Sequence, residues 1–336
     1  MLSVAIICLA TSCEKVFMDD MSNSNSREVF DEVWQFIDRN YSYFDYKNVD
    51  WNELYDEYSA QIDEGMTDED LFNVLARMLY RLHDGHVNLT SDFDRSRNWT
   101  WFLEADANFS YDLIERAYFS EEQQIVGPFI VYDFGEVGYV YNGDFSNSVE
   151  GKHLDYIIDK FSEHKGMIID VRDNGGGILG NARRWASRYT SESVLVGKRR
   201  ERNGLNHNDF TAWHDETIDS YLTDYEGSTS SDIFLKPVVV LTNRSCYSTT
   251  NYFVQYMNEL ENVTIVGDKT GGGSGIPTYK ELSNGWLLRV SATQFVTPEG
   301  IETEGGIDPD IHVQISAEDW LNQRDTILEF ALTLFD

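Results

Sequence analysis

The chain has 336 residues, which is long enough to bury one sizeable core and to carry a second small module. Hydrophobic residues make up 41% of it and aromatic residues 14%, with only 5 prolines, and this composition excludes disordered and collagen-like chains. The formal net charge of −32 repels phosphate backbones and anionic membrane surfaces, so nucleic acid is excluded as a partner.

The sequence of residues 1–26 predicts an export signal followed by a flexible tether. The opening MLSVAIICLATSC holds an apolar run of about ten residues, which is too short to span a bilayer. This segment resembles the signal and lipobox of bacterial lipoproteins, which implies that Cys13 is lipidated. We therefore expect a cell-envelope protein held by a lipid anchor only, in the periplasm or at the outer-membrane surface. The alternative is a frayed apolar N-terminus.

Helical spacing dominates the next region, and we expect a helical N-terminal subdomain over residues 27–105. In EVFDEVWQFIDRNY the apolar residues recur every three or four positions from Val29 onward. A second helix is indicated in MTDEDLFNVLARMLYRL, with Thr67 as its N-cap and Asp70 reaching back to it. This helix breaks at HDGHVNL.

Residues 106–336 predict one α/β domain with a β-rich stretch at its start. The strands FIVYDF and VGYVY precede a helix in VEGKHLDYIIDKFSEH. Strands and helices then alternate, with GMIIDV before the helix ILGNARRWASRY and KPVVVLT before the helix STTNYFVQYMNEL. VTIVG and GWLLRVSATQFV supply the last strands, and DWLNQRDTILEFALTLF predicts a closing helix. Buried apolar strands of this kind indicate an α/β core.

A glycine-rich loop, DNGGG, follows the strand GMIIDV and ends at Gly177. Glycines let a backbone approach a ligand closely and turn its N–H groups inward, which suits a phosphate cradle or an oxyanion hole. GxxxxGK[ST] is absent, and the lone GxGxxG spacing of Gly175, Gly177 and Gly180 is a weak signal, so nucleotide binding has little support. The alternative is a plain strand-to-helix turn.

Ser248 lies in NRSCYSTTNYF, after a strand and at the first turn of a helix. A serine there becomes a nucleophile when a base removes its proton, and the helix N-terminus favours the charge that develops. The alternative is an N-cap serine with no chemical role. The sequence lacks GxSxG, which disfavours an α/β-hydrolase.

Two histidines and one carboxylate complete the candidate groups. His83 and His86 follow a helix in LHDGHVNL, where metal-binding spacings such as HExxH are absent and a general base is favoured. Glu304 lies in EGIETEGGIDPDIHV, where it could orient a histidine or be one more solvated carboxylate.

The order of these loops resembles the tricorn-like branch of the C-terminal-processing (tail-specific) serine peptidase family. Five motifs follow one another between about Val29 and the C-terminus, in the order LHDGH, IIDVRDNGGG, VVVLTNRSCYSTTNYF, IVGDKTGGG and EGGIDPDI. The resemblance implies an α/β fold with a crotonase/ClpP-like catalytic core. It implies that Ser248 is the nucleophile, His86 the general base and Glu304 the acid that orients the histidine. The oxyanion hole then falls on the backbone N–H groups of Gly176 and Thr249, with Gly175 as the neighbouring candidate.

Several positions depart from the family pattern. Gly273 stands where the tail-specific branch has its catalytic lysine, which favours the histidine-based branch. Gly85 replaces the serine that precedes the histidine in the tricorn branch, so a fourth member of the relay is missing. Tyr247 stands before Ser248 where a small residue is usual, and we expect an altered pocket. The stretch before Asp170 is too short for a PDZ domain.

The sequence therefore predicts a serine endopeptidase that hydrolyses exported or unfolded polypeptides, without metal or cofactor. The alternative is a catalytically inactive lipoprotein that binds peptides or other ligands on the same fold. A third reading, thioester chemistry on coenzyme A, is disfavoured by export and by the lack of a basic phosphate-binding cluster. Nothing in the sequence indicates an oligomeric state or a substrate preference.

Overall fold

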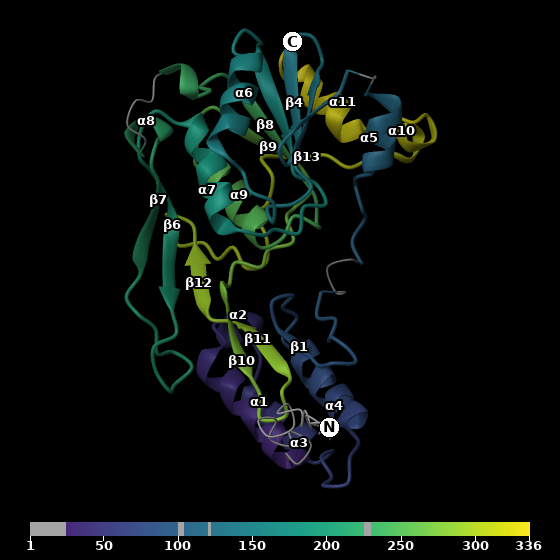
Figure 1. Cartoon of the computed structure of the whole chain (residues 1–336), viewed down its shortest axis with the longest axis vertical. Helices are drawn as coiled ribbons and strands as arrows, with labels where there is room; N and C mark the ends of the chain where they lie inside the picture. The colour runs from purple at the N-terminus through teal and green to yellow at the C-terminus, as the bar shows by residue number, and fades with distance from the viewer. Residues whose placement is uncertain (1–24, 100–103, 120–121, 225–229) are drawn as a thin grey trace, which may run out of the picture.

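The computed structural model describes residues 25–99, 104–119, 122–224 and 230–336. Cys13 and most of the predicted signal and tether lie outside these residues. The described chain forms two lobes along its long axis, with the N-terminal helices below and the larger α/β part, which holds the C-terminus, above (Figure 1). Within the described ranges, no helix combines the length and the apolar character needed to cross a membrane.

The helices of the lower lobe are α1 (Ser26–Asn40), α2 (Phe44–Lys47), α3 (Trp51–Ser59) and α4 (Asp68–Tyr80). The α1 helix begins after Asn25, whose side chain accepts a hydrogen bond from the backbone N–H of Arg27. The α4 helix begins after Thr67, which accepts from the backbone N–H of Asp70 and donates to its carboxylate. The predicted cap is therefore confirmed, and it satisfies N–H groups that the first turn leaves open.

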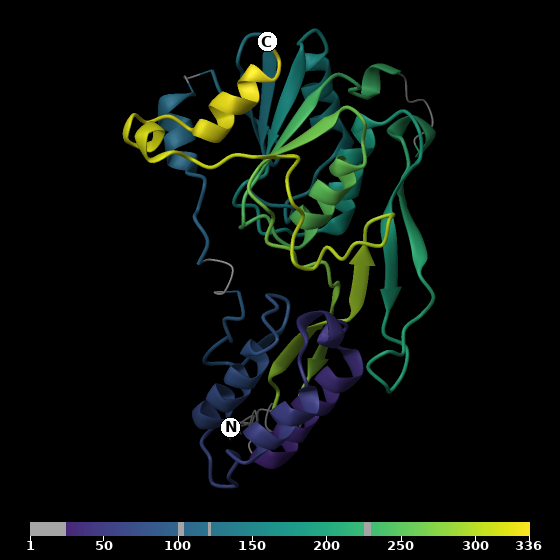
Figure 2. The same ribbon diagram turned by 180° about the vertical axis from the view of Figure 1, so that it is seen from behind.

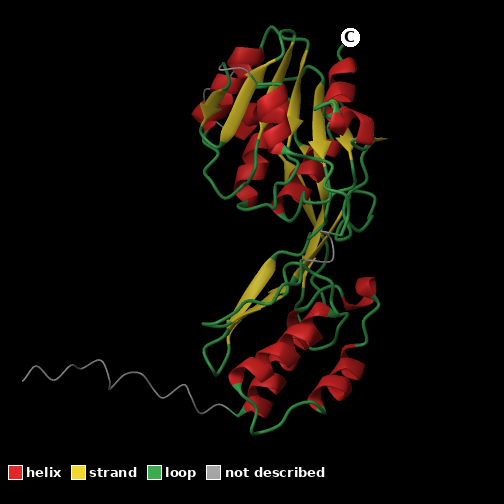
Figure 3. Cartoon of the chain, turned by 90° about the vertical axis from the view of Figure 1, so that its right-hand side faces the viewer, coloured by secondary structure: helices red, strands yellow, loops and turns green. Residues whose placement is uncertain are grey.

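Strands from much later in the chain complete the core of the lower lobe. They form an antiparallel sheet in the order β1 (Asn88–Thr90), β11 (Leu287–Ser291), β10 (Pro277–Glu281). In Figure 3 the helices lie to one side of these strands. Leu288 and Val290 of β11 belong to the same buried cluster as Val33 of α1 and Leu75 of α4. The N-terminal helices thus need a distant segment to bury their apolar faces.

A mixed sheet forms the centre of the upper lobe, with seven strands among the described residues in the order β13–β9–β8–β5–β4–β3–β2. The strands are β2 (Gln124–Val126), β3 (Phe129–Asp133), β4 (Val137–Tyr141), β5 (Gly166–Asp170), β8 (Val238–Thr242), β9 (Val263–Gly267) and β13 (Ile311–His312). Neighbours from β4 to β13 are parallel, whereas β2 and β3 are joined antiparallel. Every residue of β5 and β8 is buried, as expected for parallel strands covered on both faces.

Helices cover both faces of this sheet (Figure 2). One layer holds α6 (Gly151–Phe161), α7 (Leu179–Ala186) and α9 (Thr249–Asn258), and the other holds α5 (Tyr111–Ala117) and α11 (Thr326–Thr333). Side chains alternate along β5, so Met167 and Ile169 join the first layer and Ile168 joins the second. The result is a mixed α/β protein.

A third sheet extends from the upper lobe toward the lower one (Figure 1). Its order is β12 (Thr293–Val296), β6 (Val194–Glu201), β7 (His214–Ile218), and shorter elements nearby are η4 (Ser187–Tyr189), α8 (Tyr221–Asp224) and η5 (Ser230–Asp232). The β6–β7 loop reaches α1, where His207 Nε2 lies 2.6 Å from Asp38 Oδ1 and the imidazole stacks on Phe44. This hairpin joins the two lobes.

The prediction of one closing helix is wrong, because the segment splits into α10 (Ala317–Leu321) and α11. Asp325, between them, accepts from the backbone N–H of Leu328 and caps α11. The same carboxylate receives Arg172 Nη1 at 2.9 Å, and Arg172 also binds Asp170 at the end of β5. A helix running through residue 325 would lose both the cap and this buried ion pair.

Candidate active site

Ser248 lies between β8 and α9, at the position that an N-cap residue would take. Its φ of 60° and ψ of −121° place a non-glycine residue in a strained backbone conformation, and strain of this kind concentrates at functional sites. The side chain makes no capping hydrogen bond. Ser248 Oγ instead lies 2.8 Å from Nε2 of His86, although 162 residues separate the two in the chain. Ser248 therefore takes the N-cap position of α9 without capping the helix through its side chain.

His86 lies in the buried loop that joins α4 to β1. Its backbone N–H donates to Asp84 Oδ1 at 2.8 Å, which fixes the loop that carries the ring. Burial, followed by the positive charge of Arg289, lowers the pKa of His86 to about 4, while Asp84 and the backbone of Gly275 oppose this shift. The imidazole is therefore neutral near pH 7, so Nε2 can accept a proton from Ser248.

Asp84 is a site residue that sequence reasoning missed. It is fully buried, and Oδ2 accepts a hydrogen bond from Ser291 Oγ at 2.8 Å, while the Tyr247 hydroxyl donates to Oδ1 at 3.4 Å. Its charge also raises the pKa of His86. The sequence signal was a carboxylate two positions before the candidate base in HDGH.

Glu304 is buried, which rules out the solvated reading, but its carboxylate binds backbone rather than His86. Oε2 accepts from the N–H groups of Ser274 and Gly275 at 2.8 and 3.3 Å. Oε1 lies 3.4 Å from Lys47 Nζ. Among the described residues it makes no hydrogen bond to the imidazole, whose Nδ1 has no partner of normal geometry there. Glu304 thus holds the backbone at residues 274–275, and the Gly275 backbone in turn acts on the pKa of His86.

Lys47, at the end of α2, is a second residue that the sequence did not single out. Burial lowers its pKa, but Glu304 and Asp84 raise it by more, so the pKa of Lys47 lies above its ordinary value. Burial, the charge of Asp84 and that of Glu302 together raise the pKa of Glu304 well above its usual range, against the effect of Lys47. The lower lobe therefore supplies the counter-charge for a carboxylate of the upper lobe.

The glycine loop lies against the nucleophile. A Cβ added to Gly176 would come within 2.9 Å of both the Ser248 Cβ and the Thr249 nitrogen, and its φ of 102° also requires glycine. The Gly176 N–H, however, donates to the Asn174 side chain at 2.9 Å. Across the described residues, the N–H groups of Gly175 and Thr249 have no acceptor. The structure thus places the predicted donors together but leaves Gly176 engaged.

Tyr247 occupies the space that two glycines leave beside the pair. A Cβ at Gly85 would lie 2.9 Å from the Tyr247 hydroxyl oxygen, and one at Gly273 would lie 2.3 Å from the ring. The tyrosine ring contacts the His86 imidazole edge to face, with centroids 5.1 Å apart. The two departures from the family pattern at positions 85 and 273 therefore share one cause, the bulk of Tyr247.

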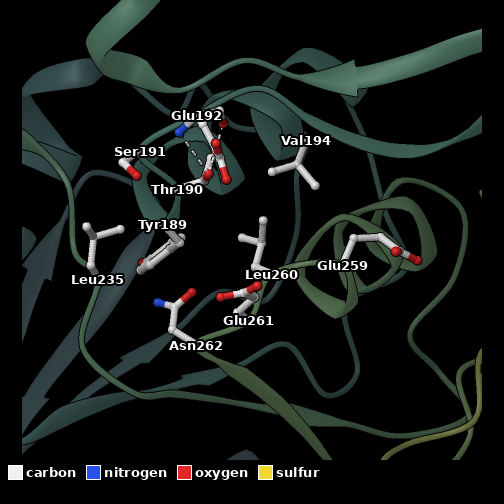
Figure 4. Close-up of a pocket in the computed structure, with 10 residues that line it drawn as sticks. All are labelled: Tyr189, Thr190, Ser191, Glu192, Val194, Leu235, Glu259, Leu260, Glu261 and Asn262. Carbon is white, nitrogen blue, oxygen red and sulfur yellow. Dashed lines mark hydrogen bonds between the residues drawn. The ribbon is translucent and has the colours of Figure 1, made fainter.

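A cavity of about 350 Å³ lies in the upper lobe, and Figure 4 shows the residues that line it. Its lining includes Glu259 and Leu260, which follow the last turn of α9. Because Ser248 precedes the first turn of this 10-residue helix, roughly 15 Å of helix separate the cavity from the nucleophile. The cavity is not part of the catalytic arrangement. In the described part of the chain, no group of three or more His, Cys, Asp or Glu residues could hold a metal ion.

Comparisons with known proteins identify the family to which the chain is similar. Residues 136–313 match the model of peptidase family S41, and residues 23–80 match the tricorn protease C1 domain. The crystal structure of a candidate peptidase from Parabacteroides merdae is 41% identical, with a TM-score of 0.86, over 93% of this chain and 97% of that one.

Curated relatives match over a shorter span. A probable CtpA-like serine protease of Staphylococcus aureus is 24% identical over 190 residues, which are 56% of this chain and 35% of the relative. The carboxyl-terminal-processing protease of Synechocystis is 27% identical over 177 residues, 52% of this chain and 37% of the relative. The chain thus spans about a third of the length of these curated relatives. The S41 match covers more than half of the chain and includes the nucleophile loop, the glycine loop and Glu304, and the chain belongs to peptidase family S41.

Proposed function

We propose that the protein is a serine endopeptidase that hydrolyses polypeptides through an acyl-enzyme. The observation that carries this is the 2.8 Å contact between Ser248 Oγ and Nε2 of a buried, neutral His86. His86 takes the hydroxyl proton as Ser248 attacks the peptide carbonyl, and the imidazolium then donates it to the leaving amine. Water repeats the two steps on the ester and releases the second product.

Two carboxylates support the histidine in this mechanism. Asp84 fixes the backbone of His86 and stabilises the imidazolium by its charge. Glu304, the acid that the family resemblance implies, holds the N–H groups of Ser274 and Gly275 and so positions the Gly275 backbone that acts on His86. We assign it a positioning role, with Lys47 holding its other oxygen.

The oxyanion hole uses Thr249 and the glycine loop. The Thr249 N–H is open at the start of α9, where the helix dipole favours negative charge. Gly176 provides the second donor when a bound substrate draws its N–H away from Asn174, and Gly175 is the neighbouring donor. The resting arrangement thus needs one local change before the hole is complete.

The wider setting of the enzyme belongs to the same proposal. The three-layer core is of the crotonase/ClpP type, preceded by a helical subdomain over residues 27–105. Cys13 carries the lipid anchor, the enzyme works in the cell envelope, and its substrates are exported or unfolded polypeptides. This setting is supported by the N-terminal sequence and the family membership.

The test is cleavage of an unfolded casein-type substrate by the purified protein and by Ser248→Ala, with EDTA present throughout. We expect cleavage by the wild type only, together with labelling of Ser248 by a fluorophosphonate. A folded wild type that neither cleaves nor reacts would instead support the binding-protein alternative, which the engaged Gly176 N–H favours.

A further inference from the structure

Among the described residues, Arg289 is a cation without an ion-pair or hydrogen-bond partner, and it lies beside the candidate catalytic pair. It forms no ion pair and no side-chain hydrogen bond with any described residue, and its Nε is buried without a partner. Acidic residues outnumber basic ones by 58 to 26 in the sequence, yet no described carboxylate pairs with Arg289. Burying a guanidinium nitrogen without a hydrogen bond is costly unless a ligand supplies one.

The sheet register places Arg289 next to His86. Arg289 of β11 pairs with Asn88 of β1, only two residues after the histidine. Its charge is the largest effect after burial that lowers the pKa of His86, and it opposes the rise in the pKa of Tyr247 that burial causes. The guanidinium is therefore close enough for its charge to be felt at His86.

One face of β11 runs outward from Asp84. Alternate residues share a face, so Ser291, Arg289 and Leu287 follow one another at intervals of about 7 Å. Ser291 donates to Asp84, Arg289 lies over the Tyr279 ring at 5.8 Å, and Leu287 is 42% exposed. Leu288 and Val290, which point the other way, are buried among the helices.

The position relative to His86 indicates which part of a substrate meets this face. The histidine must protonate the leaving nitrogen, which belongs to the residue after the scissile bond. A group on the histidine side of Ser248 therefore faces the C-terminal part of the substrate, whereas the acyl part faces the glycine loop.

On the basis of the proposed function, we propose that Arg289 binds a carboxylate of the substrate on the C-terminal side of the scissile bond. Tyr279, which is 56% exposed, and Leu287 provide apolar contacts beside it. An arginine presents a fork of donors that fits a carboxylate with two hydrogen bonds. The carboxylate is either the chain terminus of the substrate or an Asp or Glu side chain close to the cut.

The experiment measures peptide binding in the Ser248→Ala background, where no cleavage interferes. Three fluorescent peptides share one sequence and differ only in the tail: a neutral amidated tail, the same tail with a free carboxyl terminus, and an amidated tail with one Glu. We expect at least one carboxylate peptide to bind about tenfold more tightly than the neutral peptide. The peptide that binds more tightly shows whether the carboxylate is the chain terminus or a side chain.

The second variant, Arg289→Gln, tests the residue. In Ser248→Ala/Arg289→Gln the roughly tenfold gain should disappear, while affinity for the neutral peptide stays within about twofold. Lys280→Gln is the matched control, because Lys280 lies on the same sheet with its side chain on the opposite face and should leave the gain intact. Equal preference for carboxylate peptides with and without Arg289, or no preference in either protein, overturns the inference.

These outcomes are separable from failure of the proposed function. Failure of the enzyme reading appears as absent cleavage and absent fluorophosphonate labelling in the wild type, whatever the tail. Failure of the Arg289 subsite appears in peptide binding alone. If Arg289→Gln has the same melting temperature as the wild type, a lost preference for carboxylate peptides is not caused by unfolding.

Discussion

At the scale of single residues, burial sets the pH range in which His86 can act as a base. A protonated imidazole cannot accept the Ser248 proton, and burial, with the Arg289 charge, lowers the pKa of His86 to about 4. We therefore expect kcat/KM to rise with pH about a midpoint near 4 rather than near the ordinary histidine value of 6.5. A pH series of peptide hydrolysis from about pH 3 to about pH 8 measures this, because it covers both the lowered and the ordinary midpoint.

Arg289→Gln provides the control for that profile. Removing the nearby positive charge makes the imidazolium less unfavourable, so the acidic limb should move to higher pH. A wild-type midpoint at the ordinary histidine value, or a limb that moves to lower pH in the variant, would contradict the account.

The two carboxylates should differ in their effect on turnover. Asp84→Asn removes the negative charge that stabilises the imidazolium and alters the acceptor of the His86 N–H, so we expect kcat to fall by roughly 10²-fold. Glu304→Gln keeps an acceptor for Ser274 and should lower kcat by only about tenfold. Steady-state kinetics of both variants, with melting temperatures to confirm folding, compare them. A larger loss for Glu304→Gln would restore it as the direct partner of the histidine.

At the scale of elements, the conformation of the glycine loop after β5 depends more on Gly176 than on Gly175. Gly176→Ala puts a Cβ within 2.7 Å of the Tyr247 carbonyl oxygen at a φ of 102°, whereas a Cβ at Gly175 meets nothing within 4 Å. We expect Gly176→Ala to cost about 1–3 kcal/mol of unfolding free energy and to lower kcat/KM by roughly 10²-fold or more.

Gly175→Ala is the matched control for the loop. Its unfolding free energy, measured in urea, should stay within about 1 kcal/mol of the wild type, with kcat/KM changed only a few-fold. Equal losses in both variants would mean that flexibility of the loop, rather than its packing on Ser248, limits activity.

Element boundaries show what local patterns could and could not supply. Thr67 caps α4 as predicted, because the cap and its partner Asp70 are three residues apart. The split between α10 and α11 was missed, because the residue that makes it, Asp325, is held by Arg172 from a distant part of the chain. The hairpin β6–β7 was missed as well, since its contacts to α1 are equally remote.

On the scale of the whole molecule, buried acids couple folding to pH. Burial raises the pKa of Glu302 to about 7, although the N–H groups of Glu304 and Thr303 and the charges of Lys47 and Arg200 oppose the shift. The folded state therefore keeps a proton that the unfolded chain releases near the ordinary value of 4.5. The stabilisation is complete below that value and is lost as the pH rises toward 7.

Glu302→Gln tests this coupling. The melting temperature of the wild type should fall between about pH 5 and 7. That of the variant, which cannot titrate at this position, should fall by less. Melting temperatures of both proteins across that range provide the measurement. Parallel curves for the two proteins would show that Glu302 is not a source of the dependence.

The sequence by itself determined the chemistry-bearing groups and the family. Ser248, His86, Glu304 and the glycine loop carry recognisable local patterns, and the strand and helix periods around them follow from side-chain alternation. Such patterns are readable because each depends on residues a few positions apart.

Only the tertiary structure decided how these groups meet. It brought Ser248 within 2.8 Å of His86, introduced Asp84 as a further carboxylate, and turned Glu304 toward Lys47 and the backbone. These contacts join α2, the α4–β1 loop and the loop before α9, and no local pattern encodes distances between segments so far apart. The free-energy gain that assembles them comes from burying the apolar faces of both lobes, which is shared over the whole chain.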